Sequence, residues 1–366
     1  LFSPESTADE VEQFLNKELL PSDLLPRPEN VNDLLDGILD SFEVQESRLY
    51  DRAIPVGEVA VIHGAHLRSR ALQRRLRQLG YHVFETPHFL YCRGTKAFPV
   101  PSLKPILLVH WFTPDDLHTN IPHYLVEELK PFGGIPDNRR LGEWMTGIVS
   151  STLPGNVQRA WNAFGANTLQ RLLLLVCTAA PEIAPDYGIL EASATLYQRV
   201  LELSVGARFL DAGCNSGFFA LLVAERQPFV EEIIGVDLDP QVFQVAQQMV
   251  RTRQLSPVRY VQADLRSDQM ATLGLFDTVT ALHILEHFTE EDMYRVLAHL
   301  LQITKHRLII AVPYEERLSH AYDHLQLFSR TKLEAVGTWC LDHLEGAGRL
   351  WYEDLAGGLL LIEKRP

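Results

Sequence analysis

Four cysteines are all that the 366-residue sequence contains: Cys92, Cys177, Cys214 and Cys340. None stands at the spacing of a metal-binding or redox pair, so we expect free thiols and a cytoplasmic protein. Long apolar runs are also missing. The longest, residues 172–180, is too short to span a bilayer, so we expect no membrane span. The first residues lack a basic-then-apolar leader and a starting Met, so further residues are expected before them.

Positive charge is scarce as well. The chain has 33 Lys and Arg against 47 Asp and Glu, which gives a formal net charge of -14. Such a surface repels phosphate backbones, so we expect no nucleic-acid partner. A small molecule or a protein stays open as substrate, and the composition does not indicate an oligomeric state. Hydrophobic residues make up 46% of the chain, enough for the cores of two domains.

The sequence divides into three parts. Residues 1–45 are acidic and leucine-rich, with helical spacing at 6–19 and 31–42 and prolines between, and we expect a helical arm. Residues 46–188 predict a mixed α/β and helical domain that could recognise a substrate or partner. Its expected elements are a strand at 59–62, a helix at 65–79, strands at 81–84 and 106–111, and then helices.

Residues 189–366 alternate between strand and helix patterns. A helix is expected at 190–203, and the expected strands are 208–210, 233–236, 258–262, 278–282, 308–312, 349–352 and 359–363. The last two strands follow one another without a helix between them. We therefore predict an α/β domain with a seven-stranded, mostly parallel, Rossmann-like sheet that ends in an antiparallel hairpin.

The most informative motif is the segment from Phe209 to Phe219, FLDAGCNSGFF. An apolar strand runs into a glycine-containing turn, and a helix starts at once, where backbone N–H groups can face a ligand. A dinucleotide site needs glycine at the first, third and sixth positions. Counted from Gly213, those positions hold Gly213, Asn215 and Phe218, so the spacing argues against NAD.

Carboxylates follow the next two expected strands. Asp237 ends the strand at 233–236, where an acidic side chain can accept hydrogen bonds from ribose hydroxyls. A cap of the helix expected from Pro240 is the plainer interpretation of Asp237 or Asp239, and both can hold. Asp264 follows the strand at 258–262 in the same way. A fourth strand ends near Leu282 and is followed by the run from His283 to Phe288, HILEHF.

Together these four elements resemble the class I S-adenosylmethionine-dependent methyltransferases, over about residues 189–366. The Asp-x-Gly-x-Asn-x-Gly loop has Asn215 where that family usually has glycine, and asparagine tolerates the same left-handed backbone. The resemblance implies S-adenosyl-L-methionine as cofactor, with Asp237 at the ribose and Asp264 and Leu265 at the adenine. The full expected cofactor set is Asp211, Gly213, Asn215, Gly217, Phe218, Asp237, Leu238, Asp264, Leu265 and His283.

Histidines are the expected catalytic residues, because imidazole can take a proton near neutral pH. His283 and His287 follow the central strand, and His320 and His324 follow the fifth. On a helix, His320 and His324 would share a face and could bind a metal, but no further ligand is evident and we expect no metal site.

The reaction implied is methyl transfer to an N, O or C nucleophile of a small metabolite. A protein substrate docked by the N-terminal domain is the alternative within this class. Two alternatives lie outside the methyltransferases. One is an NAD-dependent oxidoreductase, which the loop spacing disfavours. The other is a non-catalytic Rossmann-like scaffold, which the three carboxylates Asp211, Asp237 and Asp264 disfavour.

Overall fold

The computed structural model describes residues 54–56, 58–64, 70–78, 80–94, 105–134, 138–153, 155–177, 189–255, 257–318 and 323–365. The helical arm expected at 1–45 and the candidate residue His320 lie outside them. Contacts divide the chain into two compact units, Leu1–Leu117 with Tyr124–Trp161, and His118–His123 with Asn162–Pro366. This division by contacts is not a test of which segments fold on their own, so the domain boundary expected at 188/189 stays a prediction.

The first unit contains a five-stranded sheet of order β1-β2-β5-β4-β3. Strands β2 and β5 pair in parallel, and the other neighbours pair antiparallel. The strands are β1 (Ile54–Val56), β2 (Val59–His63), β3 (Tyr81–Glu85), β4 (Phe89–Gly94) and β5 (Ile106–His110). The helices are α3 (Arg70–Gln78), η3 (Pro114–Asp116), α4 (Ile121–Leu129), η4 (Lys130–Phe132), α5 (Asn138–Thr152) and α6 (Val157–Cys177). Of these, α4 and α6 have residues in both units.

The expected strand-helix-strand pattern is found in β2, α3 and β3, but the sequence reasoning missed β4. That strand pairs with both β3 and β5, so the sheet is mixed. Its residues Phe89, Leu90, Tyr91 and Cys92 are all buried. A strand covered on both faces lacks the alternation of apolar and polar residues that marks a strand in sequence.

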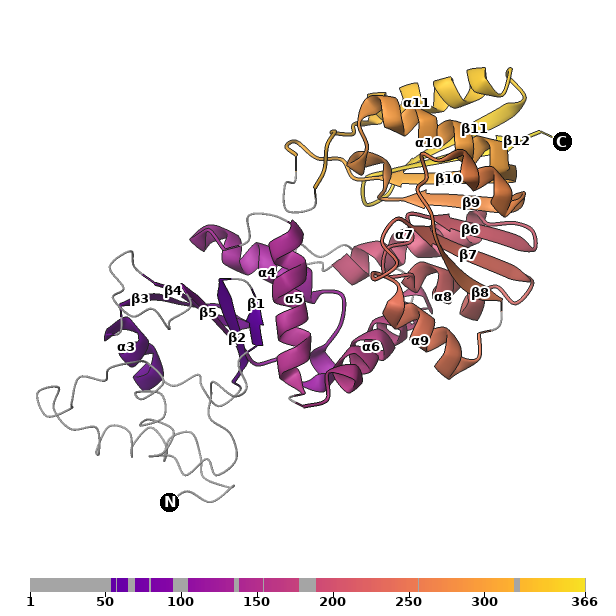
Figure 1. Ribbon diagram of the computed structural model, residues 1–366. Helices are drawn as coiled ribbons and strands as arrows, with labels where there is room; N and C mark the ends of the chain where they lie inside the picture. Colours follow the sequence, from indigo (N-terminus) through magenta and orange to yellow (C-terminus); the bar gives the residue numbers. More distant parts are fainter. Residues whose placement is uncertain are drawn as a thin grey trace, which may run out of the picture. The chain divides into compact units, whose positions relative to one another are not determined.

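The second unit is built on a seven-stranded sheet of order β11-β12-β10-β9-β6-β7-β8 (Figure 1). Its strands are β6 (Arg208–Ala212), β7 (Glu232–Asp237), β8 (Val258–Gln262), β9 (Phe276–Leu282), β10 (Thr304–Val312), β11 (Gly348–Asp354) and β12 (Gly358–Lys364). Its helices are α7 (Ile189–Leu203), α8 (Phe218–Arg226), α9 (Gln244–Arg253), η5 (Asp268–Leu273), η6 (Leu285–His287), α10 (Glu290–Ile303) and α11 (Arg330–His343).

The register of this sheet confirms the predicted topology. Strands β8, β7, β6, β9 and β10 run parallel to one another, and β12 runs antiparallel to both of its neighbours, β10 and β11. All seven expected strands are present. Strand β9 lies at the centre, as predicted, so the carboxyl ends of β6, β7, β8 and β9 meet at one edge of the sheet.

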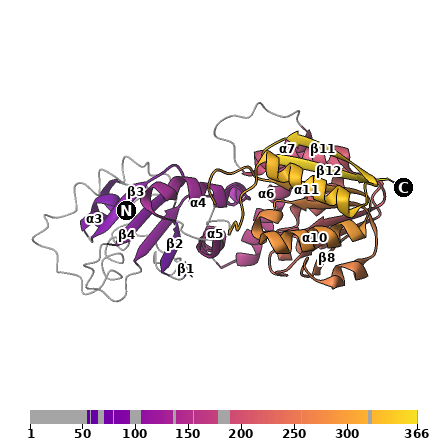
Figure 2. The same cartoon turned by 90° about the horizontal axis from the view of Figure 1, so that it is seen from above.

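Successive side chains of a strand point to opposite faces of the sheet, so alternate residues pack against different layers of helices. Leu210 packs in the cluster formed with α10 and α11, whereas the ring of Phe209 lies 6.0 Å from that of Phe219 on α8. Phe219 in turn contacts Tyr197 of α7, at 4.5 Å between ring centroids. Helices α7 and α11 therefore cover opposite faces (Figure 2).

Among the described residues, no helix is long and apolar enough to cross a membrane. The four cysteines are free thiols, as expected, and Cys92, Cys214 and Cys340 are buried. In all three, burial raises the pKa of the thiol, so none carries the thiolate that metal binding or nucleophilic chemistry requires.

The start of helix α7 depends on a residue distant in sequence. The side chain of Asn120 is buried; its Oδ1 accepts a hydrogen bond from the backbone N–H of Leu190 at 2.8 Å, and its Nδ2 donates to Glu191 at 3.0 Å. Asn120 thereby satisfies an N–H that has no partner within the helix.

We expect Asn120→Ala to lower the free energy of unfolding by about 1–3 kcal/mol, because it removes two hydrogen bonds and leaves the buried N–H of Leu190 without an acceptor. Urea unfolding followed by circular dichroism measures this. The matched control is Thr338→Ala, which removes an exposed side-chain hydrogen bond on α11. Equal stability of the two variants would contradict the capping role.

Candidate active site

The candidate residues gather at the edge where four parallel strands end. Asp211 lies in β6 beside Gly235 of β7, and Asp237 at the end of β7 lies beside Gln262 of β8. Asp264 follows β8 by two residues, and His283 follows β9 directly. The carboxyl edge of a parallel sheet is where α/β folds bind their ligands, and it holds every described candidate of the sequence analysis except His324, which comes from a later loop.

The loop after β6 is a tight turn that needs glycine. Gly213 and Gly217 have φ values of +72° and +74°, and Asn215 has +45°, the left-handed conformation expected there. A Cβ on Gly213 would lie 2.5 Å from Ile284, and one on Gly217 would lie 2.5 Å from the Tyr260 ring. The turn is closed by the N–H groups of Gly213 and Cys214, which both donate to Val236 O.

Helix α8 begins at Phe218 without a side-chain cap. The Phe218 side chain is buried and faces Phe164, with 6.3 Å between ring centroids. This residue therefore presents its backbone N–H, rather than its ring, at the helix start. The first N–H groups of a helix carry partial positive charge and attract acceptor groups.

Asp237 fastens the turn from the neighbouring strand. Its Oδ2 accepts from the Asn215 N–H at 2.9 Å, and its Oδ1 accepts from the Asp239 N–H at 3.2 Å. It does not cap the following helix, because α9 begins only at Gln244; Asp239 instead accepts from the Gln241 N–H. Next to Asp237, the Leu238 side chain is 59% exposed, which offers an apolar surface at the strand end.

Asp264 is paired with Arg266, a partner that the sequence reasoning missed. The Arg266 guanidinium lies 2.8 Å from Oδ2, and its backbone N–H donates to Oδ1 at 2.9 Å. These bonds lower the pKa of the Asp264 carboxyl, which holds it ionised. Leu265 is buried, and its carbonyl is hydrogen-bonded to the ring of His299.

Asp211 is a buried carboxyl whose hydrogen-bond partner is Thr280 of β9. The Thr280 hydroxyl donates to Oδ1 at 2.9 Å, across a pair of residues that face each other in register. Burial raises the pKa of Asp211 to about 7, the hydroxyl opposes that rise, and the negative charge of Asp237 adds to it. A cation bound nearby would favour the ionised form of Asp211.

The turn after β9 carries two of the predicted histidines. His283 has a φ of +52°, its side chain is 41% exposed, and its Nδ1 lies 3.6 Å from Oε1 of Glu286. Glu286 and His287 follow in η6. The Glu286 side chain is only 1% exposed, and its Oε2 has no hydrogen-bond partner among the described residues.

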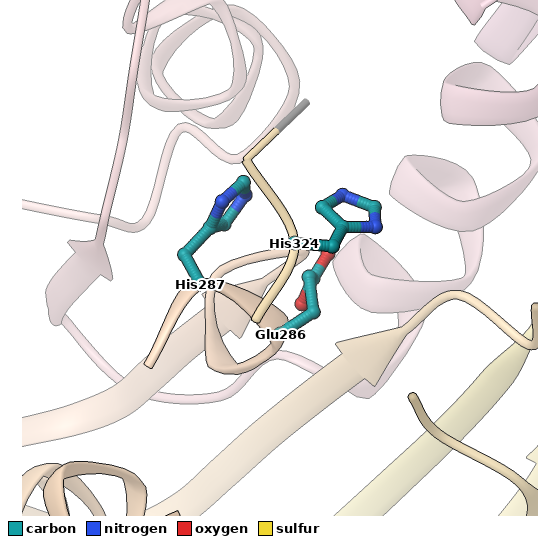
Figure 3. Close-up of side chains that lie close together, drawn as sticks. All are labelled: Glu286, His287 and His324. Carbon is teal, nitrogen blue, oxygen red and sulfur yellow. The ribbon is translucent and has the colours of Figure 1, made fainter. Parts of the chain in front are cut away.

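His324 joins these residues from a later loop. Its ring lies 5.0 Å from that of His287, at an interplanar angle of 82°. Glu286, His287 and His324 lie close together (Figure 3), and a ligand atom from each falls within 4.8 Å of the others. The Nδ1 of His324 is hydrogen-bonded to Glu315 at 2.6 Å. Glu315 was not predicted; it follows the fifth parallel strand, β10, but nothing in the sequence pairs it with His324.

The donor set at this edge fits S-adenosylmethionine, which is a cation with two ribose hydroxyls and an adenine ring. A buried carboxyl of raised pKa at Asp211 suits the positive charge. Asp237 offers carboxylate oxygens for the hydroxyls, and Leu238 beside it offers an exposed apolar side chain for the adenine face.

Comparisons with known proteins concern the same part of the chain. Residues 209–307 match the family described as a methyltransferase domain. The chain is 26% identical over 144 residues to the magnesium-protoporphyrin O-methyltransferase of Rhodobacter capsulatus. That match covers 39% of this chain and 62% of the relative, so the chain spans less than two thirds of its relative's length.

Two solved structures are also similar. Magnesium protoporphyrin IX methyltransferase from Synechocystis PCC 6803, with bound SAH, is 15% identical, with 54% of this chain and 94% of that chain covered and a TM-score of 0.37. The small RNA methyltransferase HEN1 is 15% identical, with 51% and 27% covered and a TM-score of 0.44.

Proposed function

We propose that the protein transfers a methyl group from S-adenosylmethionine to an N, O or C nucleophile of a small metabolite, because its residues 209–307 match a methyltransferase domain. The observation that carries the proposal is the arrangement of Asp211, Asp237 and Asp264 at or just after the ends of three neighbouring parallel strands, beside the left-handed turn at Asn215. The cofactor supplies an activated methyl group on a positively charged sulfur.

The protein's own part is mainly binding and alignment. Asp237 would hold the ribose hydroxyls, Asp264 and Leu265 the adenine edge, and Leu238 the adenine face. The glycine turn and the N–H groups at the start of α8 would lie against the rest of the cofactor. Alignment of two reactants can contribute several orders of magnitude in rate, so a site of this kind needs few other groups.

His283 is the residue best suited to take a proton from the acceptor. It directly follows the central strand β9, it is exposed, and Glu286 lies on its Nδ1 side. That contact leaves Nε2 to accept a proton. A base matters only for a nucleophile that still carries its proton, as a hydroxyl does.

The metabolite substrate is supported by the curated relative, whose name gives magnesium-protoporphyrin as its acceptor. A protein acceptor is the second candidate, because the first unit has its own sheet and core outside the matched residues 209–307. Assays of a small-molecule extract and of a protein extract with labelled S-adenosylmethionine would separate the two, because the label enters different fractions.

We expect Asp237→Ala to weaken binding of S-adenosylhomocysteine by more than tenfold, as measured by calorimetry. The loss of a charged acceptor should cost about 1.5–3 kcal/mol. Because Asp237 also fastens Asn215, Asp237→Asn serves as a second variant that keeps the size and one acceptor oxygen. Asp239→Ala, an exposed neighbouring carboxylate, is the matched control and should bind like the parent. Parental affinity in both Asp237 variants would contradict the assignment.

A further inference from the structure

The cluster of Glu286, His287 and His324 has the composition of a metal site. It offers one carboxylate and two imidazoles, the ligand set that divalent first-row transition ions favour. The three ligand atoms lie within 4.8 Å of one another. Bonds of about 2.0–2.2 Å to a shared ion place ligand atoms about 3–4 Å apart, so the side chains need to draw together by only about 1 Å.

Glu286 is the strongest single indication of a ligand. A buried carboxylate is stable only when it is paired or fully hydrogen-bonded. Glu286 is almost fully buried, yet Oε2 has no hydrogen-bond partner among the described residues, and Oε1 reaches only His283 at 3.6 Å. A bound cation would satisfy this oxygen.

His324 is oriented as metal-binding histidines are. Its Nδ1 lies 2.6 Å from an oxygen of the Glu315 carboxylate, a hydrogen bond in which the carboxylate accepts, so that Nε2 would be the atom that binds the ion. A carboxylate behind a histidine in this way fixes the ring and raises the basicity of its other nitrogen, as in carboxylate–histidine–metal arrangements. The His324 side chain is 8% exposed, so this orientation is held by burial as well.

The backbone brings the two parts of the cluster together. The N–H groups of Leu325 and Gln326 both donate to the carbonyl of Glu286, at 2.8 and 3.3 Å, and the Gln326 side chain donates to Leu285 O at 2.9 Å. The loop that carries His324 is therefore attached to the turn that carries Glu286 and His287. Ligands positioned before binding lose less conformational entropy when the ion arrives.

We propose that Glu286, His287 and His324 bind a divalent transition-metal ion at the acceptor side of the site. Three protein ligands leave at least one coordination position open, as catalytic rather than structural sites do. His283, beside Glu286, is near enough to influence that position. The relevance of the ion to methyl transfer rests on the proposed function, but metal binding itself does not.

The test is titration of the full chain, freed of metal by a chelator, with Co²⁺ followed by visible absorption and calorimetry. We expect one saturable equivalent with the spectrum of nitrogen and oxygen ligands. Glu286→Gln and His324→Ala should each weaken it at least tenfold. The matched controls are Glu334→Gln and His306→Ala, which alter exposed groups elsewhere on the same unit, and both should bind like the parent.

A stability measurement separates a metal ligand from a merely structural residue. Without metal, Glu286→Gln should melt at or above the parent temperature, because it replaces a buried carboxylate whose Oε2 has no hydrogen-bond partner among the described residues. Co²⁺ should raise the melting temperature of the parent and not that of the variant. Absence of saturable binding, or binding that survives in both Glu286→Gln and His324→Ala, would overturn the proposal. Neither result depends on turnover, so the proposed methyl transfer is tested separately.

Discussion

His283→Ala is expected to turn over about a hundredfold more slowly than the parent, while its affinity for S-adenosylhomocysteine stays within a few fold. A general base contributes about 10²–10⁴ in rate, and its removal affects turnover without affecting cofactor binding. The position of His283 is the basis for this expectation. Its side chain is exposed at the end of the central strand, and the backbone N–H of His283 is fixed by Ala311 O at 2.9 Å.

The design must separate a base from a residue that shapes the turn. His283 has a left-handed backbone, so His283→Asn is the second variant, because asparagine tolerates that conformation and has no basic nitrogen. His306→Ala, which changes an exposed histidine near the start of β10, is the control for loss of an imidazole. If His283→Asn turns over like the parent, the base lies elsewhere or the acceptor needs none. A parallel loss of cofactor affinity would instead indicate a structural role.

His287 and His324 were predicted as catalytic on the same grounds as His283. The structure brings His287 and His324 together with Glu286, so their variants report on the metal proposal as well as on turnover. His283→Asn, which leaves that cluster's ligands intact, is therefore the cleaner test of proton transfer.

The sheet of the second unit was predictable because most of its strands contain a short apolar run bounded by turn residues. Ile233 to Val236, for example, is buried throughout and ends in a carboxylate. The helix expected from 65 to 79 is present from Arg70 to Gln78, and its other expected residues lie outside those that the structure describes. Strand β4 was missed because it is buried on both faces.

The cofactor side of the site was predictable for a related reason. Parallel strands end at a common edge, so residues at successive strand ends, such as Asp237 and Asp264, must lie near one another. The cluster around His324 was not predictable in this way. It depends on Leu325 and Gln326 returning to the backbone of Glu286, a long-range contact that leaves no periodic pattern. Without it, the sequence offered only His320 as a partner for His324.

Asp211 gives the second large expected effect, on stability rather than on turnover. The carboxyl has an ordinary pKa of 3.8, and burial in the folded protein raises that pKa to about 7. Between these values the folded protein keeps a proton that the unfolded chain has released. The free energy of unfolding therefore falls as pH rises through this window, by about 1.4 kcal/mol per pH unit. Above pH 7 the accumulated cost levels off at about 4 kcal/mol.

Asp211→Asn should remove that cost, because an amide has nearly the same shape, can still accept the hydrogen bond from Thr280, and does not ionise. We expect the variant to match the parent near pH 4 and to be several kcal/mol more stable at pH 8, with the difference growing between pH 4 and 7. Urea unfolding of both proteins at several pH values measures it. Other titrating groups cancel in the difference between the two proteins, so a difference that is flat from pH 4 to 8 would mean that the Asp211 carboxyl ionises normally. In that case the buried position of Asp211 beside Thr280 would be wrong. The argument that a carboxyl of raised pKa at this position suits the positive charge of the cofactor would then fail as well.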